Sequence, residues 1–196
     1  DHLSLYQLTI EEGTPFGDLH RLGKLVTPDE HTAADLYEAT RGLLEAAGMP
    51  AYEVSNHAVP GAECRHNLVY WRYGEYVGIG PGAHGRLVLG DGRHATADEK
   101  VPERWLQRVE TQGHGRTVDD LLTLDEQGDE YLLMGLRLAE GLDLARFETI
   151  SGRALDPSRL ADLTGHGLVE TTPDGRLRAT PAGFAILDAI VADLAA

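Results

Sequence analysis

Cysteine is almost absent from this sequence, since Cys64 is the only one among 196 residues. A single cysteine cannot form a disulfide within the chain. It also cannot hold an iron–sulfur cluster, because such clusters take several cysteine thiolates. Any cluster associated with this chain would therefore need cysteines from elsewhere.

Long apolar runs are also absent. No run of about 18 apolar residues is present to cross a bilayer. The first residues, DHLSLYQL, lack the basic region and long apolar stretch of a signal peptide. We therefore expect a cytoplasmic protein with no integral membrane segment. Because the chain starts at Asp1 and enters an apolar run at once, we also expect it to be a piece of a longer chain.

Basic charge is scarce. The chain has 17 Lys and Arg against 32 Asp and Glu, and its formal net charge is -15. Residues 117–196 hold 15 acidic residues and six Arg but no Lys. Nucleic-acid binding needs a segregated basic surface that can contact phosphates. We therefore expect no nucleic acid partner. The hydrophobic content of 42% and the charged content of 25% are those of an ordinary globular protein.

The first half predicts an α/β fold with a parallel sheet. Residues 3–10 (LSLYQLTI) have the apolar pattern of a strand buried on both faces. The capping-box sequence at residues 27–30, with proline at the first helical position, predicts a helix that continues to Gly48. A short strand follows at residues 51–58. Together these segments predict a βαβ unit with parallel pairing.

Turn signals divide the middle of the chain. Asp91-Gly92 predicts a hairpin, and residues 101–113 predict a helix. We expect a domain boundary near Gly113 to Arg116, giving one domain at residues 1–115 and a second at residues 116–196.

The second half predicts a small helical domain with one hairpin. A capping box at residues 123–126 opens a helix that is expected to reach Gly141. Further elements are predicted as two short helices, a β-hairpin and a closing helix at residues 143–150, 156–164, 168–180 and 181–194. This order of elements predicts a winged-helix-like module.

The segment CRHNLVYW, residues 64–71, concentrates reactive and aromatic side chains. A lone histidine near aromatic residues is more often structural than a ligand. However, a neutral imidazole is also the commonest axial ligand of haem iron. Tyr70 and Trp71 could offer a flat apolar surface to a macrocycle, or could anchor the core. The residues alone leave both interpretations of His66 open.

Two other segments have ambiguous patterns. Gly78, Gly80 and Gly82 match neither a Rossmann fingerprint nor a P-loop. They predict a tight turn, or a loop whose backbone N–H groups meet the polar end of a nucleotide-like ligand. Glu53 and Asn56 would face a ligand if they lie at a strand end. Alternatively, Asn56 starts a turn and Glu53 pairs with a nearby base.

Four segments carry a family resemblance. HLSLYQLTIEEGTPF, YEVSNHAVPG, ECRHNLVYW and YVGIGPGAHG, in this order and spacing, closely resemble the C-terminal half of the HemW family. These proteins are radical S-adenosylmethionine haem chaperones, similar to oxygen-independent coproporphyrinogen III oxidase. The resemblance covers residues 2 to about 113 and continues more loosely through the tail.

The resemblance implies a fold and cofactors. The family has a partial TIM-type barrel with a [4Fe–4S] cluster on a CxxxCxxC loop and S-adenosylmethionine across the strand ends. A small helical, winged-helix-like domain follows the barrel. Because the cysteine loop belongs to the N-terminal half of family members, this chain should hold only the last barrel strands and the tail, and should be inactive alone.

The resemblance also assigns roles to single residues. The family motif HNxxYW corresponds to His66, Asn67, Tyr70 and Trp71, and His66 would be the haem-iron ligand. We expect a neighbouring polar group such as Asn67 to hold the second imidazole nitrogen, with Tyr70 and Trp71 packed beneath the haem. Cys64 is the competing iron ligand.

The expected S-adenosylmethionine contacts lie elsewhere. Tyr6 and Thr9 match positions that contact this cofactor in the related oxidase. Gly80, Ala83 and His84 lie in the matching glycine-rich segment, near the same cofactor. His57 departs from the family pattern, which usually has an aromatic residue there, often Phe.

The function that follows is haem binding and delivery to client haemoproteins. The alternative is oxidative decarboxylation of the two propionates of coproporphyrinogen III. The HNLVYW segment favours the chaperone, because the oxidase has no such motif. A transcriptional regulator built on the winged-helix-like tail is disfavoured by its acidic charge.

Overall fold

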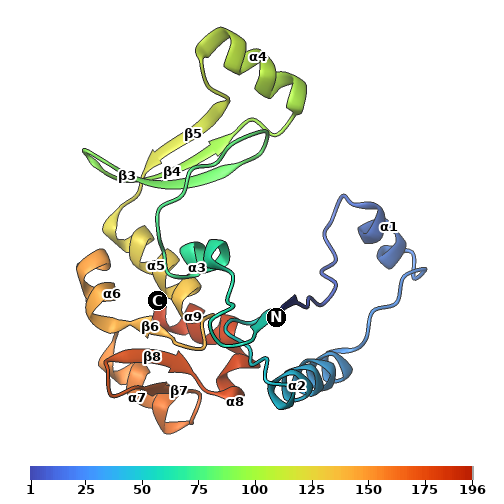
Figure 1. Ribbon diagram of the computed structural model, residues 1–196, viewed down its shortest axis with the longest axis vertical. Coiled ribbons are helices and arrows are strands. Elements are labelled where there is room, and N and C mark those ends of the chain that lie inside the picture. The colour runs from blue at the N-terminus through green and yellow to red at the C-terminus, as the bar shows by residue number, and fades with distance from the viewer. Residues whose placement is uncertain (196) are drawn as a thin grey trace. The chain divides into compact units, whose positions relative to one another are not determined.

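The computed structural model describes residues 1–195 as a mixed α/β fold (Figure 1). The chain forms two compact units, Asp1–Glu63 and Cys64–Ala196, which are described separately. Among the described residues, no helix combines the length and the apolar character needed to cross a membrane.

The first unit contains two short strands and two helices, which are β1 (His2–Ser4), α1 (Pro15–Arg21), α2 (Glu30–Ala46) and β2 (Asn56–Ala58). Strand β1 pairs antiparallel with β2, with Leu3 opposite His57. The predicted parallel βαβ unit is therefore wrong. The physical reason is that residues 51–58 turn back on themselves, because Ala51 bridges His57 and the Tyr52 N–H donates to the Asn56 carbonyl.

Helix α2 starts two residues later than predicted. Its N-cap is Asp29, whose carboxylate accepts a hydrogen bond from the Thr32 N–H. This bond lowers the pKa of Asp29. Asp is at least as good an N-cap acceptor as Thr, so Asp29 takes the place expected for Thr27.

The second unit begins with α3 (Arg65–Trp71) and an antiparallel sheet in the order β3-β4-β5. These strands are β3 (His84–Leu89), β4 (Gly92–Asp98) and β5 (Arg116–Leu121), and α4 (Pro102–Gln112) connects the last two. The hairpin predicted at Asp91-Gly92 is confirmed, with Leu89 opposite Gly92.

The predicted domain boundary coincides with the start of β5. Because β5 pairs with β4, residues 116–121 share a sheet with residues before the boundary. The contacts divide the chain instead after Glu63. The division at residues 115 and 116 therefore stays a prediction.

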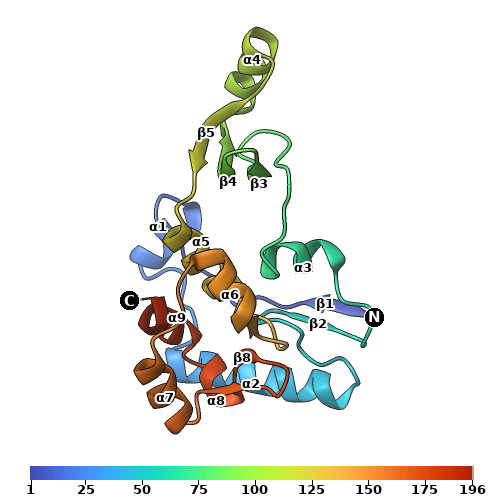
Figure 2. The same ribbon diagram turned by 90° about the vertical axis from the view of Figure 1, so that its left-hand side faces the viewer.

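The rest of the second unit consists of helices around a small sheet. Helices α5 (Leu124–Gly135), α6 (Leu144–Ser151), α7 (Pro157–Gly165), α8 (Pro181–Phe184) and α9 (Leu187–Ala195) accompany strands β6 (Leu142–Asp143), β7 (Val169–Thr171) and β8 (Arg176–Ala179). The sheet order is β6-β8-β7. Figure 2 shows α6, α7, α8 and α9 gathered around β8.

Most sequence predictions hold in this region. The capping box at Thr123 and Glu126 is present, and the hairpin of β7 and β8 is confirmed. Helix α5 ends at Gly135 instead of Gly141, because the chain continues in turns, in which the Leu138 N–H donates to the Gly135 carbonyl and the Gly141 N–H to the Leu138 carbonyl. The core of this region consists of fully buried apolar side chains, which include Leu132, Leu136, Leu142, Phe147, Leu177 and Ile190.

Candidate functional site

Helix α3 carries the predicted haem motif and is fixed at its C-terminal end. Tyr73, just beyond the helix, has a φ of 52°, and the Gly74 N–H donates to the Val69 carbonyl. Two arginines donate to the final carbonyl groups. Arg93 contacts the Tyr73 and Gly74 oxygens, and Arg146 contacts those of Arg72 and Tyr73. Cationic side chains at this end also interact favourably with the helix dipole.

His66 and Tyr70 form a pair on one face of α3. The Tyr70 hydroxyl lies 3.0 Å from His66 Nε2, and the two rings meet edge to face at a centroid distance of 4.8 Å. Residues four apart on a helix share a face, which explains the contact. Tyr70 therefore holds Nε2 of His66, and the expected contact of Asn67 with the imidazole stays a prediction. Nδ1 of the exposed His66 makes no hydrogen bond within residues 1–195.

Tyr76 extends this pair toward the glycine-rich segment. Its ring meets the Tyr70 ring edge to face at 4.4 Å, and its backbone forms a β-bridge with Arg86. Burial raises the pKa of the Tyr76 hydroxyl. Tyr76 was not among the site residues predicted from the sequence. The only signal was a fourth aromatic residue close after Tyr70, Trp71 and Tyr73.

Trp71 lies on a different face of α3 from His66. Its ring packs against the guanidinium of Arg137, whose central carbon is 4.6 Å from the ring centroid. The indole Nε1 is shielded from solvent and has no hydrogen-bond partner in the described part of the chain. Successive helical residues point about 100° apart, so Tyr70 and Trp71 face different directions, and their packing beneath a haem stays a prediction.

A partly buried polar network supports the end of α3. Glu130 of α5 accepts hydrogen bonds from the Tyr73 hydroxyl and from Arg86 of β3, with Nη2 at 2.6 Å. Burial and the bond to Glu130 raise the pKa of Tyr73. The Arg93 guanidinium stacks over the Tyr73 ring at 3.9 Å. This network joins α3, the β3-β4 hairpin and α5, so it fixes the position of the motif.

The glycine-rich segment passes close to its neighbours. A Cβ on Gly78 would lie 2.4 Å from the His84 carbonyl oxygen, so only glycine fits there. Gly80 has a φ of 108°, which disfavours any L side chain. Ala83 is half-buried and His84 is exposed. The turn interpretation is thus confirmed, while a ligand contact at Gly80, Ala83 and His84 stays a prediction.

Tyr6 and Thr9 lie in the first unit, in a segment without regular structure. Tyr6 borders a cavity of about 460 Å³ that is lined by residues 5–8 and by α2. His57 also borders this cavity. Its side chain is almost completely buried, and neither ring nitrogen has a hydrogen-bond partner in the described chain. Burial and the nearby positive charge of Arg41 lower the pKa of His57.

Glu53 and Asn56 hold the turn between residues 51 and 58. Glu53 is buried, and its Oε1 accepts hydrogen bonds from the Ser55 N–H and from Asn56 Nδ2. Ser4 donates to Asn56 Oδ1 across the β1-β2 pair. These contacts give both side chains a structural role.

The donor groups in the chain limit which cofactors it can hold by itself. Within residues 1–195, no group of three or more His, Cys, Asp or Glu side chains is arranged to hold a metal ion. Cys64 is a free thiol at the N-terminus of α3 and caps nothing with its side chain. Single-residue axial ligation, as in haem proteins, remains compatible with His66.

Comparisons with known proteins place these observations in a family. Residues 122–186 match the HemN C-terminal domain. Radical S-adenosyl methionine domain-containing protein 1, mitochondrial, from Danio rerio is 37% identical over 97% of this chain and 45% of its own length. The heme chaperone HemW of Mycobacterium tuberculosis is 36% identical over 99% of this chain and 47% of its own.

One solved structure has the same fold. The coproporphyrinogen III oxidase HemN from Escherichia coli, described as a radical SAM enzyme, superposes with a TM-score of 0.70 and 19% identity. The match covers 99% of this chain and 48% of that one. This chain spans about half the length of the curated relatives it matches.

Proposed function

This chain belongs to the HemW branch of the oxygen-independent coproporphyrinogen III oxidase-like family, and we therefore propose that the protein is a haem chaperone. In this proposal the whole protein binds haem and delivers it to client haemoproteins. The observation that carries the proposal is the His66–Tyr70 pair on α3, in which one imidazole nitrogen is held and the other makes no hydrogen bond within the described residues.

The residues around His66 fit an axial haem ligand. A ligating histidine usually has its other nitrogen held by a hydrogen bond, which fixes the ring orientation and the tautomer. Tyr70 would hold Nε2 and leave Nδ1 to face the iron. Tyr76 would support the Tyr70 ring from the other side. Bound haem would supply an iron centre, and the chain would orient the imidazole that receives it.

The residues of this chain do not fit an iron–sulfur cluster. One thiol, that of Cys64, cannot replace the cysteines that a four-iron cluster requires. In the proposal, the cluster and most of the S-adenosylmethionine site come from the remaining length of the relatives. Tyr6, Thr9, Gly80, Ala83 and His84 are proposed to complete that cofactor site.

The proposal also includes the folds of the two parts of the chain. We propose that residues 1–115 complete a partial TIM-type barrel in the whole protein and that residues 116–196 form a winged-helix-like domain. The helices around the β7-β8 hairpin support the second assignment. A cytoplasmic location stays a prediction, since the relative from Danio rerio is named as mitochondrial.

The oxidase alternative receives support from fold alone. The HemN structure shares the architecture at 19% identity, whereas the chain shares 34% to 37% identity with bacterial proteins named HemW. The chaperone function is therefore the stronger proposal.

Haem titration tests the proposal directly. We expect the whole protein to bind haem with a Soret band that His66→Ala removes or greatly weakens. Cys64→Ser, two residues away, is the matched control and should leave the band nearly intact. The reverse outcome would make Cys64 the ligand. If both variants bind haem like the wild type, the assignment of His66 is wrong.

A further inference from the structure

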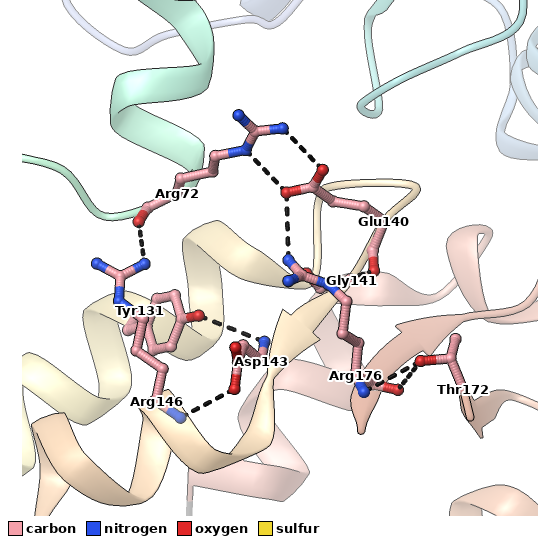
Figure 3. Close-up of polar contacts among 8 residues, drawn as sticks. All are labelled: Arg72, Tyr131, Glu140, Gly141, Asp143, Arg146, Thr172 and Arg176. Atoms are coloured by element: carbon pink, nitrogen blue, oxygen red, sulfur yellow. Dashed lines mark hydrogen bonds and ion pairs between the residues drawn. The ribbon is translucent and has the colours of Figure 1, made fainter. Parts of the chain in front are cut away.

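We propose that a cavity between α3, the end of α5 and the β6-β8 pair binds the carboxylate of a small organic acid. The cavity has a volume of about 300 Å³ and lies wholly within the second unit. Figure 3 shows the polar side chains that surround it. This site does not depend on the proposed haem binding.

The cavity concentrates positive charge. Arg72, Arg146 and Arg176 line it, and the opposing carboxylates are those of Glu140 and Asp143. The three guanidiniums outnumber the two carboxylates, although the chain as a whole has a net charge of -15. A local positive surplus in a concave wall attracts anions even on an acidic molecule.

The arginines of the cavity already bind one carboxylate, that of Glu140. Glu140 accepts two parallel hydrogen bonds from Arg72, from Nε and Nη2, both at 2.8 Å. Its Oε1 also accepts from Arg176 Nη2 at 3.2 Å. A guanidinium that holds a carboxylate through two parallel bonds gives the planar recognition that arginine provides for such groups. Glu140 is therefore an internal example of the proposed ligand chemistry.

Donors remain after these bonds are counted. Arg176 Nη1 and Arg146 Nε donate no hydrogen bond within residues 1–195. One acceptor is already used, because Asp143 Oδ1 receives the Arg146 N–H at the start of α6. The Tyr131 hydroxyl accepts from the Asp143 N–H and keeps its own proton to donate. The cavity thus has more donors than acceptors, which fits an anion.

The remaining wall favours an organic anion. The rings of Trp71 and Tyr131 and the side chain of Leu138 line the same cavity. Flat apolar surface beside guanidiniums suits the carbon skeleton of a carboxylic acid better than a strongly hydrated inorganic phosphate. We therefore assign carboxylate as the ligand group and make phosphate an outcome of the test.

A purely structural role for these arginines makes a different prediction. In that case Arg72, Glu140 and Arg176 only tie α3 to the β8 strand, and no added anion would affect them. Removal of Glu140 would then only destabilise the fold. If the cavity binds carboxylates, Glu140 competes with the ligand, so Glu140→Gln should increase affinity.

Indole NMR signals give a site-specific measurement. The chain has two tryptophans, Trp71 in the cavity wall and Trp105 on α4, whose Nε1 donates to Asp98 at 2.9 Å. Acetate, succinate and inorganic phosphate are titrated separately into the 15N-labelled chain, with neutral succinamide as control. We expect acetate and succinate to shift the Trp71 indole signal saturably while the Trp105 signal stays in place. Succinamide should shift neither signal.

Arginine variants identify which side chains donate hydrogen bonds to the bound carboxylate. Arg176→Gln should weaken succinate binding at least tenfold, and Arg146→Gln provides the same test if the first variant does not fold. Arg178→Gln is the matched control, because Arg178 lies two residues along β8 and pairs with Glu170. It should bind like the wild type. Glu140→Gln should tighten binding severalfold.

Three outcomes would overturn the proposal. The first is an unchanged Trp71 signal with both carboxylates, and the second is an equal effect of Arg176→Gln and Arg178→Gln. The third is weaker binding by Glu140→Gln when circular dichroism shows an intact fold. A saturable response to phosphate alone would replace the carboxylate assignment with a phosphate site.

Discussion

The hydroxyl of Tyr70 lies 3.0 Å from Nε2 of His66, one turn away on the same face of α3. This contact decides which imidazole nitrogen remains for a ligand. If the Tyr70 hydroxyl accepts a hydrogen bond from the Nε2–H group, Nδ1 carries the lone pair that binds a metal. The pair therefore links a helix periodicity, two residues four apart, to the coordination chemistry of the proposed site.

Removing the Tyr70 hydroxyl should weaken haem binding without removing the ligand. Tyr70→Phe keeps the ring and its edge-to-face contact with Tyr76. We expect a haem affinity roughly 10- to 100-fold lower, the usual cost of losing the hydrogen-bond partner of a metal-binding histidine. A titration followed at the Soret band measures this change.

Tyr37→Phe is the matched control. Tyr37 on α2 also contacts a residue one helical turn away, since its hydroxyl accepts a hydrogen bond from Arg41. This variant should bind haem like the wild type. If Tyr70→Phe shows wild-type affinity and an unshifted Soret band, Tyr70 does not orient the imidazole.

The backbone at Gly80 should resist substitution. Gly80 has a φ of 108°, although a Cβ there would meet nothing within 4 Å. The cost of Gly80→Val therefore comes from conformation rather than from a clash, and we expect about 1–3 kcal/mol of destabilisation. Urea denaturation measures it. In the whole protein we also expect loss of S-adenosylmethionine binding with the fold largely kept.

Gly42→Val is the matched control for the effect of backbone conformation at Gly80. Gly42 in α2 likewise has no atom within 4 Å of a Cβ, but its φ is not in the left-handed region. It should lose less stability than the Gly80 variant. Unchanged S-adenosylmethionine affinity in Gly80→Val would reduce the glycine-rich segment to an ordinary turn.

Local signals in the sequence predicted much of the second unit. The Thr123–Glu126 capping box and the Asp91-Gly92 turn act through neighbouring atoms, so each is readable from a few residues. The strand direction at residues 3–10 was not predictable in this way. Apolar β-formers do not specify a partner, and the pairing followed from the tight turn of residues 51–58.

The candidate site was predictable only in part. The four-residue spacing of His66 and Tyr70 makes them neighbours only on a helix, and no local pattern predicted that residues 65–71 are helical. The partner of Arg72 is Glu140, 68 residues away, and that of Arg86 is Glu130, 44 residues away. Such long-range ion pairs carry no local pattern and therefore needed the structure.

The free energy of unfolding should fall as the pH rises, because His94 loses its stabilising charge. Its Nδ1 and Nε2 each lie 2.9 Å from a carboxylate, those of Asp119 and Asp91. The bonds to Asp91 and Asp119 raise the pKa of His94 above its usual value. Only the imidazolium can donate from both nitrogens. Arg116, which contacts Asp119, is the other charged group in this cluster.

The sign follows from the raised pKa. The stabilisation is fully present below the unfolded-state pKa of about 6.5 and is lost as the pH rises through the higher folded-state value. We expect the urea midpoint of the wild type to fall over that range relative to His94→Gln. An NMR titration of the His94 ring should give a pKa above the usual histidine value of about 6.5. A lower value would contradict the charged pair.

His57 should behave in the opposite way, because its pKa is lowered. Burial disfavours the imidazolium, so the folded chain keeps His57 neutral where the unfolded chain would bind a proton. The contribution of His57 to stability is therefore complete above a pH of about 6.5 and is lost as the pH falls toward the folded-state pKa. The wild type should lose stability in this acidic range.

Replacing His57 by Phe should both stabilise the fold and remove this acid sensitivity. Two buried ring nitrogens without partners cost about 1–3 kcal/mol, and a phenyl ring has no such groups to satisfy. The adjoining cavity of about 460 Å³ leaves room for the slightly larger ring. We expect a gain of about 1 kcal/mol in urea denaturation, whereas His31→Phe on the exposed surface of α2 should change little. A loss of stability in His57→Phe would mean that the ring nitrogens of His57 bind a group in that cavity.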